Sequence, residues 1–257
     1  MIKGNCKLCL EKDIDLVKSH IYPKFIFKDL KGKNGNEKMV QFRPNDKKIK
    51  SKKMSDYFYD EGLLCQNCEN RIGVYEKYLQ NFLFKEIEIE KCFIEKTNSL
   101  SIVHLNNVDY KKYKLGLLSI LWRSSITNHS NYKNVDLGDK HNERIRLMIL
   151  NDDCKEVNDY PILTSIMDKE NDLINTILPI EKSKTNGIIQ YTFYINKFGF
   201  YFMVGSEEKM NTIKYYEFLP NQTGNLKIMK HQENYMKGLF ESYLFNDSSL
   251  RIKYNKS

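Results

Sequence analysis

The fold of this chain is decided by three short stretches: Cys6-Lys7-Leu8-Cys9, Ser19-His20-Ile21-Tyr22-Pro23-Lys24 and Cys65-Gln66-Asn67-Cys68. Each cysteine stretch is a Cys-x-x-Cys pair, and two such pairs of thiolates can close a tetrahedral zinc site. The alternative is a pair of redox motifs. A redox motif belongs at the start of a helix in a βαβ unit, and the first pair does not lie in one. The sequence therefore predicts structural zinc held by Cys6, Cys9, Cys65 and Cys68.

Hydrophobic periodicity, together with glycine, proline and lysine content, predicts the other elements of residues 1–85. These elements are a strand over 14–21, a lysine-rich loop over 31–53 with a short strand at 39–42, an extended segment over 57–64 and a helix over 66–85. His20 is therefore expected near the end of the first strand, and the second cysteine pair at the start of the helix.

Beyond residue 85 the pattern changes and predicts a larger α+β domain with an antiparallel sheet. Its expected helices are 110–128, 140–150, 163–178 and 232–245, and its expected strands are 86–90, 188–195, 198–204, 213–219 and 226–229. Aromatic residues occupy both faces of the hairpin over 188–204, which favours a buried sheet over an exposed binding platform. The sequence thus predicts two domains, 1–85 and 86–257, the second of unassigned role.

Size, hydrophobic content and charge limit the class of protein. With 257 residues, of which 41% are hydrophobic, the chain can bury a core. The longest apolar run, around Leu115 to Trp122, is too short to cross a bilayer, and the first residues lack the apolar segment of a secretion signal. Since the paired cysteines also favour a metal in a reducing compartment, we expect a cytoplasmic protein without a membrane partner.

The positive charge is concentrated at one end of the chain. Residues 1–60 carry 15 Lys+Arg and 8 Asp+Glu, which is a net charge of +7 out of +8 for the whole chain. An excess of this size indicates a polyanionic partner, of which nucleic acid is the commonest. The alternative explanation is a solvated lysine-rich loop with no partner.

Two of the quoted regions resemble the HNH endonuclease family. Val17-Lys18-Ser19-His20-Ile21-Tyr22-Pro23-Lys24 is similar to its His-Ile-x-Pro segment, and Gly62-Leu63-Leu64-Cys65-Gln66-Asn67-Cys68-Glu69-Asn70 to its Leu-Cys-x-x-Cys-His/Asn helix start. The resemblance covers residues 1–80. It implies that a zinc-bound treble-clef, or ββα-metal, module precedes the α+β domain, and that the protein hydrolyses phosphodiester bonds of DNA.

The resemblance also implies roles for single residues. His20 would be the general base, and Glu69 would bind a catalytic Mg²⁺ or Mn²⁺, with Asn70 as the next candidate. Where the family often has Asp, Asn and His or Asn, this chain has Ser19, Glu61 and Glu69; a carboxylate at the last position suits a hard cation. The alternative is a non-catalytic nucleic-acid-binding or scaffold protein that keeps the zinc fold.

Basic residues close to these regions are candidate phosphate contacts. They are Lys24, Lys47, Lys48, Lys50, Lys52, Lys53 and Arg71. Such contacts supply affinity with a steep salt dependence and little sequence discrimination. For Arg71 the alternative is a salt bridge to Glu76 on the same helix, and Trp122-Arg123 is interpreted as core followed by a cation at a helix end.

The expected substrate is DNA, and RNA cleavage by the same site is the alternative. Small HNH proteins with a large additional domain resemble effectors of bacterial anti-phage or mobile-element systems. This resemblance implies that residues 86–257 bind a sensor or regulatory protein.

Overall fold

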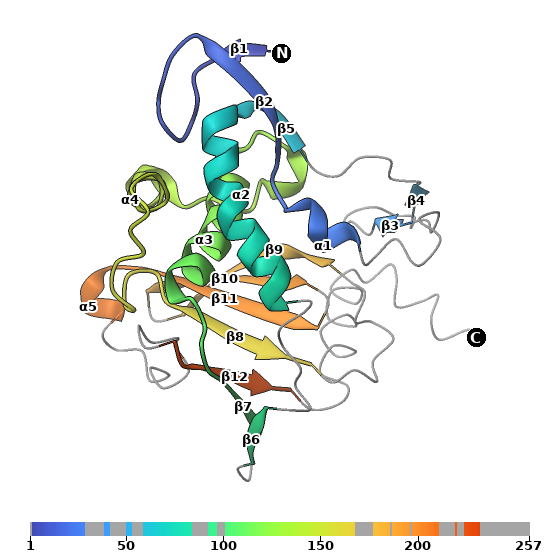
Figure 1. The fold of residues 1–257 in the computed structure, drawn as a ribbon, viewed down its shortest axis with the longest axis vertical. Coiled ribbons are helices and arrows are strands. Elements are labelled where there is room, and N and C mark those ends of the chain that lie inside the picture. Colours follow the sequence, from blue (N-terminus) through green and yellow to red (C-terminus); the bar gives the residue numbers. More distant parts are fainter. Residues whose placement is uncertain are drawn as a thin grey trace.

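The structure is a computed structural model of the chain, drawn in Figure 1. It describes residues 2–28, 39–41, 50–52, 59–83, 92–96, 101–167, 177–185, 187–195, 197–210, 219 and 224–231. Within these residues the fold is α+β, with one three-stranded, one two-stranded and one seven-stranded sheet. The expected α+β class is therefore confirmed.

The three-stranded sheet holds the segments that carry the sequence motifs. Its antiparallel strands are β1 (Ile2–Gly4), β2 (Ile14–His20) and β5 (Tyr59–Cys65), in the order β1-β2-β5. Helix α2 (Gln66–Asn81) begins directly after β5, as predicted. The predicted strand ending near His20 is also confirmed, and helix α1 (Lys24–Lys28) follows it after Pro23.

A two-stranded antiparallel sheet lies within the segment that was predicted to be a lysine-rich loop. It consists of β3 (Met39–Gln41) and β4 (Lys50–Lys52). The short strand expected at 39–42 is thus confirmed, and its partner strand is an addition to the prediction.

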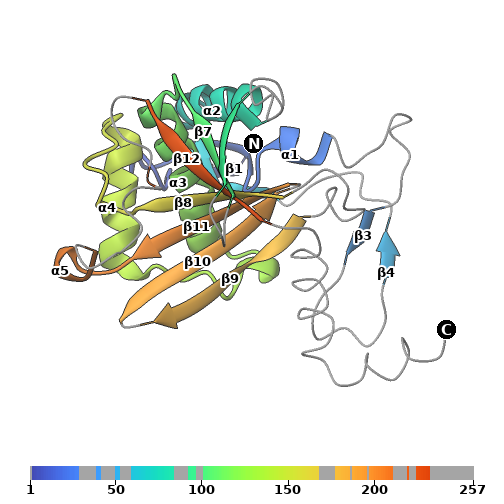
Figure 2. The ribbon, with the colours of Figure 1, turned by 90° about the horizontal axis from the view of Figure 1, so that it is seen from below.

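Helix α3 (Tyr110–Ile126) is the central helix of the molecule, and most of its residues are buried. On one side it packs against α2, where a Cβ atom at Gly116 would lie 2.7 Å from Leu79 Cδ1. On the other side the hydroxyl of Tyr113 hydrogen-bonds that of Thr164 in the large sheet. Figures 1 and 2 show the helices on one face of that sheet. A helix covered on both sides needs apolar residues around its whole circumference, as this sequence has.

The remaining helices lie around α3. Helix α4 (Gly138–Leu150) packs against it, and the short elements are a 3₁₀ helix, η4 (Ser130–Tyr132), and helix α5 (Glu207–Met210). The helices predicted at 110–128 and 140–150 are therefore confirmed. The helix predicted at 232–245 lies outside the described residues, as does the strand predicted at 86–90.

The seven-stranded sheet has the order β6-β7-β12-β8-β11-β10-β9. Its strands are β6 (Phe93–Lys96), β7 (Ser101–Leu105), β8 (Ile162–Ile166), β9 (Ile177–Thr185), β10 (Ile188–Ile195), β11 (Phe198–Val204) and β12 (Leu226–Lys230). All neighbouring pairs are antiparallel except β12 and β8, so the sheet is mixed where a purely antiparallel one was expected. The predicted hairpin, β10 with β11, is confirmed, and its aromatic side chains are largely buried. Of the strand predicted at 213–219, only Leu219 belongs to the described residues.

The helix predicted over 163–178 is wrong. Residues 162–166 form the strand β8, and 177–185 form β9. Strand β8 lies inside the sheet and all five of its residues are buried. A strand buried on both faces lacks the alternation of apolar and polar residues that marks a half-buried strand, and β8 (Ile-Leu-Thr-Ser-Ile) has no such alternation, so its pattern does not separate it from a helix.

The two predicted domains share one buried apolar cluster in the described residues. It extends from Cys6 and Ile72 to Trp122, Phe200 and Ile228. The boundary between residues 85 and 86 stays a prediction. The packing of α2 on α3 nevertheless means that the motif-bearing segments rest directly on the rest of the molecule.

Candidate metal centre and the adjoining polar site

The four cysteines of the two Cys-x-x-Cys pairs come together in space. The sulfur atoms of Cys6, Cys9, Cys65 and Cys68 all lie within 4.8 Å of one another. The Cys9 and Cys65 sulfurs are 4.0 Å apart, far beyond the about 2.05 Å of a disulfide. Four thiolates at about 2.3 Å from a tetrahedral zinc have sulfur–sulfur distances of about 3.8 Å. The cluster can therefore hold a metal ion such as zinc.

Backbone hydrogen bonds hold the two cysteine pairs side by side. The turn that contains the first pair connects β1 to β2, and its Lys7 amide donates to the Leu63 carbonyl at 2.8 Å. The Cys65 amide donates to the Cys6 sulfur at 3.4 Å. Leu10 ends this turn with a positive φ of 64°. Because β5 continues straight into α2, the second pair lies on the last strand residue and the first helical turn.

The close contacts within the cluster shift the pKa values of its thiols in opposite directions. The pKa of Cys6 is lowered to about 4, chiefly because the Cys68 thiol donates a hydrogen bond to its sulfur. The pKa of Cys68 is raised, first by that same bond with Cys6 and then by burial. Burial also raises the pKa of Cys9. Four thiolates this close repel one another, so the fully ionised cluster requires a cation at its centre.

A buried arginine of α4 holds the first cysteine pair from outside. Arg146 donates from Nη1 to the backbone carbonyl of Leu8, which lies between Cys6 and Cys9. Its Nε and Nη2 atoms contact the two carboxylate oxygens of Glu143, each at 2.7 Å. The turn around the metal ligands is therefore fixed by a residue far along the chain.

Next to the cysteine cluster, the residue before His20 meets the residue after the last cysteine. Ser19 is fully buried, and its hydroxyl donates to Glu69 Oε2 at 3.1 Å. The register of β2 against β5 shifts between Val17 and Ser19, from Leu64 to Asp60, so the extra residues of this bulge or irregularity lie on β5. Such irregularities redirect nearby side chains. Glu69 is half-buried in the first turn of α2, where the helix dipole favours a carboxylate.

The Glu69 carboxylate lies in a partly desolvated and mixed electrostatic environment. Its pKa is raised, mainly by burial and further by the nearby charge of Glu76. Arg123 opposes this rise, as do the hydrogen bond from Ser19 and the charge of Lys24. A cation close to a partly buried carboxylate of this kind lowers the pKa of the carboxylate and so favours its charged form.

Arg123 is the residue of this site that sequence reasoning missed. It lies in the last turn of α3, as interpreted from the sequence, and it is also fully buried, with its Nη2 2.5 Å from Glu76 Oε1. Its Nη1 donates to the backbone carbonyl of His20. The available signal was an arginine directly after the apolar run Leu115 to Trp122, because a charge buried beside such a run requires a partner.

The salt bridge to Glu76, which was the alternative explanation for Arg71, is not formed, and both residues make other contacts. Arg71 is exposed and donates from Nη1 to the Leu150 carbonyl at the end of α4, at 2.9 Å. Glu76 pairs with Arg123 instead. Arg71 therefore joins α2 to α4.

His20 is the last residue of β2 and is 6% exposed. Its ring centroid lies 6.3 Å from that of Tyr59 on β5, and the rings are tilted by 44°. The ammonium of Lys18 lies 3.6 Å above the centroid of the same tyrosine ring. His20, Tyr59 and Lys18 thus form the edge of the site beside Ser19.

The other predicted site residues lie at varying distances from this centre. Asn70 is exposed and its side chain accepts a hydrogen bond from Gln66 at 2.8 Å. Lys24 is exposed at the start of α1, close enough for its charge to act on Glu69. Lys50 and Lys52 lie in β4. Lys47, Lys48 and Lys53 lie outside the described residues.

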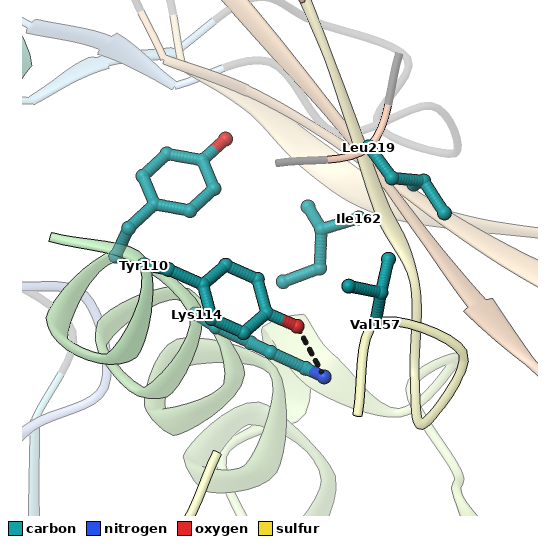
Figure 3. A pocket seen from close by; sticks show the side chains of 6 residues that line it. Tyr110, Lys114, Val157, Ile162 and Leu219 are labelled. Carbon is teal, nitrogen blue, oxygen red and sulfur yellow. Dashed lines mark hydrogen bonds between the residues drawn. The ribbon is translucent and has the colours of Figure 1, made fainter. Parts of the chain in front are cut away.

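A small cavity beside α3 is lined by a third buried cation, Lys114. Figure 3 shows its lining, which consists of Tyr110, Tyr113, Lys114, Val157, Ile162 and Leu219. Its volume of about 10 Å³ is at the lower limit for a single water molecule. Lys114 donates to the Tyr110 hydroxyl at 3.0 Å and to the Glu156 carbonyl at 2.5 Å. The cavity is too small for a substrate, so we interpret Lys114 as a structural residue.

Comparisons of the chain with protein-family models, with curated proteins and with solved structures found no match. Among the described residues, no helix is both long and apolar enough to cross a membrane. The function of the chain is therefore inferred from the chemistry of its metal centre and the polar site beside it.

Proposed function

We propose that this protein is a zinc-stabilised, metal-dependent endonuclease of the HNH type that hydrolyses DNA phosphodiester bonds. The proposal treats the cysteine cluster as a structural zinc centre and residues 2–83 as a treble-clef, or ββα-metal, module. It is supported by the order of the elements, in which a strand ending at His20 and a second strand lead into a helix beginning at the second cysteine pair.

One observation carries the proposal, and it is the hydrogen bond between Ser19 and Glu69. These residues occupy the two positions at which the HNH family places its metal ligands, one before the histidine and one after the last cysteine. They are 50 positions apart in the chain. Their contact brings two oxygen ligands together beside His20, and oxygen ligands suit Mg²⁺ or Mn²⁺.

The roles follow from the chemistry of each group. Glu69, with Ser19, would hold the divalent cation, which when bound stabilises the negative charge on the leaving oxygen. His20 would accept the proton of the water that attacks phosphorus. Lys24 would contact the phosphate backbone, together with Arg71 and the lysines of the segment around β4. Asn70 would be the next candidate ligand of the divalent cation after Glu69.

A specific observation favours the alternative of a non-catalytic nucleic-acid-binding module. His20 is 6% exposed, and the buried guanidinium of Arg123 already supplies a positive charge near Glu69. In that case His20 and Glu69 would hold the module together, and DNA binding would need neither Mg²⁺ nor Mn²⁺.

A plasmid-nicking assay with Mg²⁺ or Mn²⁺ separates the two functions. We expect wild type to nick, and His20→Ala to be slower by about 10²–10⁴-fold while it keeps its zinc and its DNA affinity. Glu69→Ala should lose both activity and the dependence on added metal. The matched control is His104→Ala, because His104 lies on β7 and contacts Glu95 at 3.0 Å. Absence of nicking by wild type would support the non-catalytic function, and equal nicking by wild type and His20→Ala would show that His20 is not the general base.

A further inference from the structure

Two buried contacts join α3 to the polar site. Arg123 lies in the last turn of α3, in the part of the chain for which the sequence assigned no role. Its guanidinium reaches β2 at the His20 carbonyl and α2 at the Glu76 carboxylate. A third contact, from Nε to the Ser119 carbonyl at 3.2 Å, fixes the guanidinium on its own helix. One side chain therefore bridges the strand that ends at His20 and the helix that carries Glu69.

We propose that Arg123 is a positioning residue for the nuclease site, so that residues 86–257 complete this site as well as packing against it. The inference rests on the proposed function, because His20 and Glu69 are the residues whose relative position it concerns. Arg123 touches neither substrate nor cation. It acts by holding the main chain of His20 against α2 at a fixed distance from Glu69.

The geometry requires a guanidinium. The two Nη atoms point to different elements, while Nε donates within α3, so three separate donors are used at once. A lysine ammonium has a single nitrogen at the end of a flexible stem and does not reproduce this fork. Since Arg123 is fully buried, loss of its charge would also leave Glu76 without its cation.

A fixed carbonyl at His20 matters because this residue is the last of its strand. The ladder between β2 and β5 is already interrupted by the bulge before Ser19, and β2 ends at His20. The Arg123 hydrogen bond therefore adds a restraint where the sheet itself ends. Misplacement of a catalytic group by about 1 Å can cost about 10²-fold in rate.

The experiment uses the full chain and the variants Arg123→Met, Arg123→Lys and Glu76→Gln. The control is Arg144→Met, which removes an exposed arginine paired with Asp159 on the outside of α4. Three quantities are measured: the NMR shifts of the His20 carbonyl carbon and ring, assigned by their loss in His20→Ala; the zinc content; and kcat and KM for plasmid nicking.

We expect Arg123→Met to keep one zinc per chain, to shift the His20 carbonyl and ring signals, and to lower kcat about 10²-fold without changing KM. Arg123→Lys should recover part of kcat, and Glu76→Gln should shift the same signals by less. The control should match wild type in all three measurements. A structural role alone would lower the unfolding temperature and leave the His20 signals and kcat unchanged, which would overturn the inference.

The inference and the proposed function fail separately. If wild type does not nick DNA but Arg123→Met shifts the His20 signals, Arg123 positions His20 and the nuclease proposal is wrong. If wild type nicks and the His20 signals are unmoved in Arg123→Met, the inference is wrong. Should Arg123→Met not fold, Arg123→Lys and Glu76→Gln decide, and unmoved His20 signals in both would overturn the inference.

Discussion

The cysteine region, residues 2–83, and the sheet region, residues 92–231, are stabilised in different ways. The sheet region buries aromatic and aliphatic side chains of its long hairpin, such as Phe193 and Phe200, against α3. The cysteine region has one three-stranded and one two-stranded sheet, and its four clustered thiols form no disulfide among them. The sheet region therefore depends on burial of apolar area. In the cysteine region, a cluster that can hold a metal is supported by contacts from the neighbouring region.

The contacts between the two regions follow a repeated pattern. Two buried arginines of the sheet region, Arg123 and Arg146, each donate to a backbone carbonyl of the cysteine region. Each arginine is also paired with a glutamate. Since a buried guanidinium is costly unless it is fully paired, these contacts join the regions specifically and not through apolar packing alone. The cysteine region, which carries the candidate site, is therefore held in place partly by buried arginines of the sheet region.

The largest expected effect is loss of the metal centre. Purified protein should contain about one zinc per chain, and Cys65→Ser with Cys68→Ser should abolish it. Structural zinc contributes about 10–16 kcal/mol in small modules, so β2 and α2 should lose hydrogen-exchange protection while β10 and β11 keep it. Cys92→Ser is the control, because Cys92 lies outside the cluster. Zinc-free protein with a protected β2 would contradict the proposed dependence on metal.

A smaller effect concerns the buried cation of the sheet region. Burial lowers the pKa of Lys114 to about 8, against about 10.4 in an unfolded chain. The stability that Lys114 contributes is thus present above about pH 10.4 and is lost as the pH falls towards 8. As the pH falls between these limits, the free energy of unfolding of wild type should decrease by about 3 kcal/mol relative to that of Lys114→Met.

Urea unfolding of wild type and Lys114→Met at several pH values measures this difference. The hydrogen bonds that Lys114 makes are lost equally at each pH, so the change with pH isolates the titration of the amine. A constant difference from pH 8 to 10.5 would mean that the Lys114 amine is solvated in the folded protein.

The smallest expected effect concerns the packing of α2 on α3, which two helical glycines, Gly116 and Gly73, can test. A Cβ at Gly116 would meet Leu79 at 2.7 Å, whereas a Cβ at Gly73 would have nothing within 4 Å. Gly116→Ala should therefore lower the free energy of unfolding by about 1–3 kcal/mol through overpacking of α2 on α3. Gly73→Ala should raise it by about 0.5–1 kcal/mol through helix propensity. Denaturant unfolding measures both, and equal effects would show that α2 adjusts freely on α3.

Much of the cysteine region was predictable because the spacing of its motifs determines which residues must lie close together. The cysteine spacing anticipated the cluster, and the position after Cys68 anticipated that Glu69 lies near the end of β2. Arg123 was not assigned to the site, because its partners Glu76 and His20 are 47 and 103 positions away. Sequence spacing specifies local neighbours, and such distant pairs arise only from the packing of α2, α3 and β2.

In the sheet region, amphipathic or isolated elements were predictable and the centre of the sheet was not. The hairpin of β10 and β11 is rich in aromatic and β-branched residues and has a short connection, and both strands were located within one residue. Strand β8 was mistaken for a helix because Ile162–Ile166 is buried on both faces. Its parallel partner β12 lies far along the sequence, so no local turn residues predict that these two strands pair.

The contact between Arg146 and Leu8 has a consequence for synthesis of the chain. The two residues are 138 positions apart. At translation rates of 5–20 residues per second, roughly 7–28 s pass between their emergence from the ribosome. During that interval the cysteines are made but the first pair lacks its outer support. The contact that holds the cysteine turn from outside can therefore form only after α4 has been synthesised and has docked.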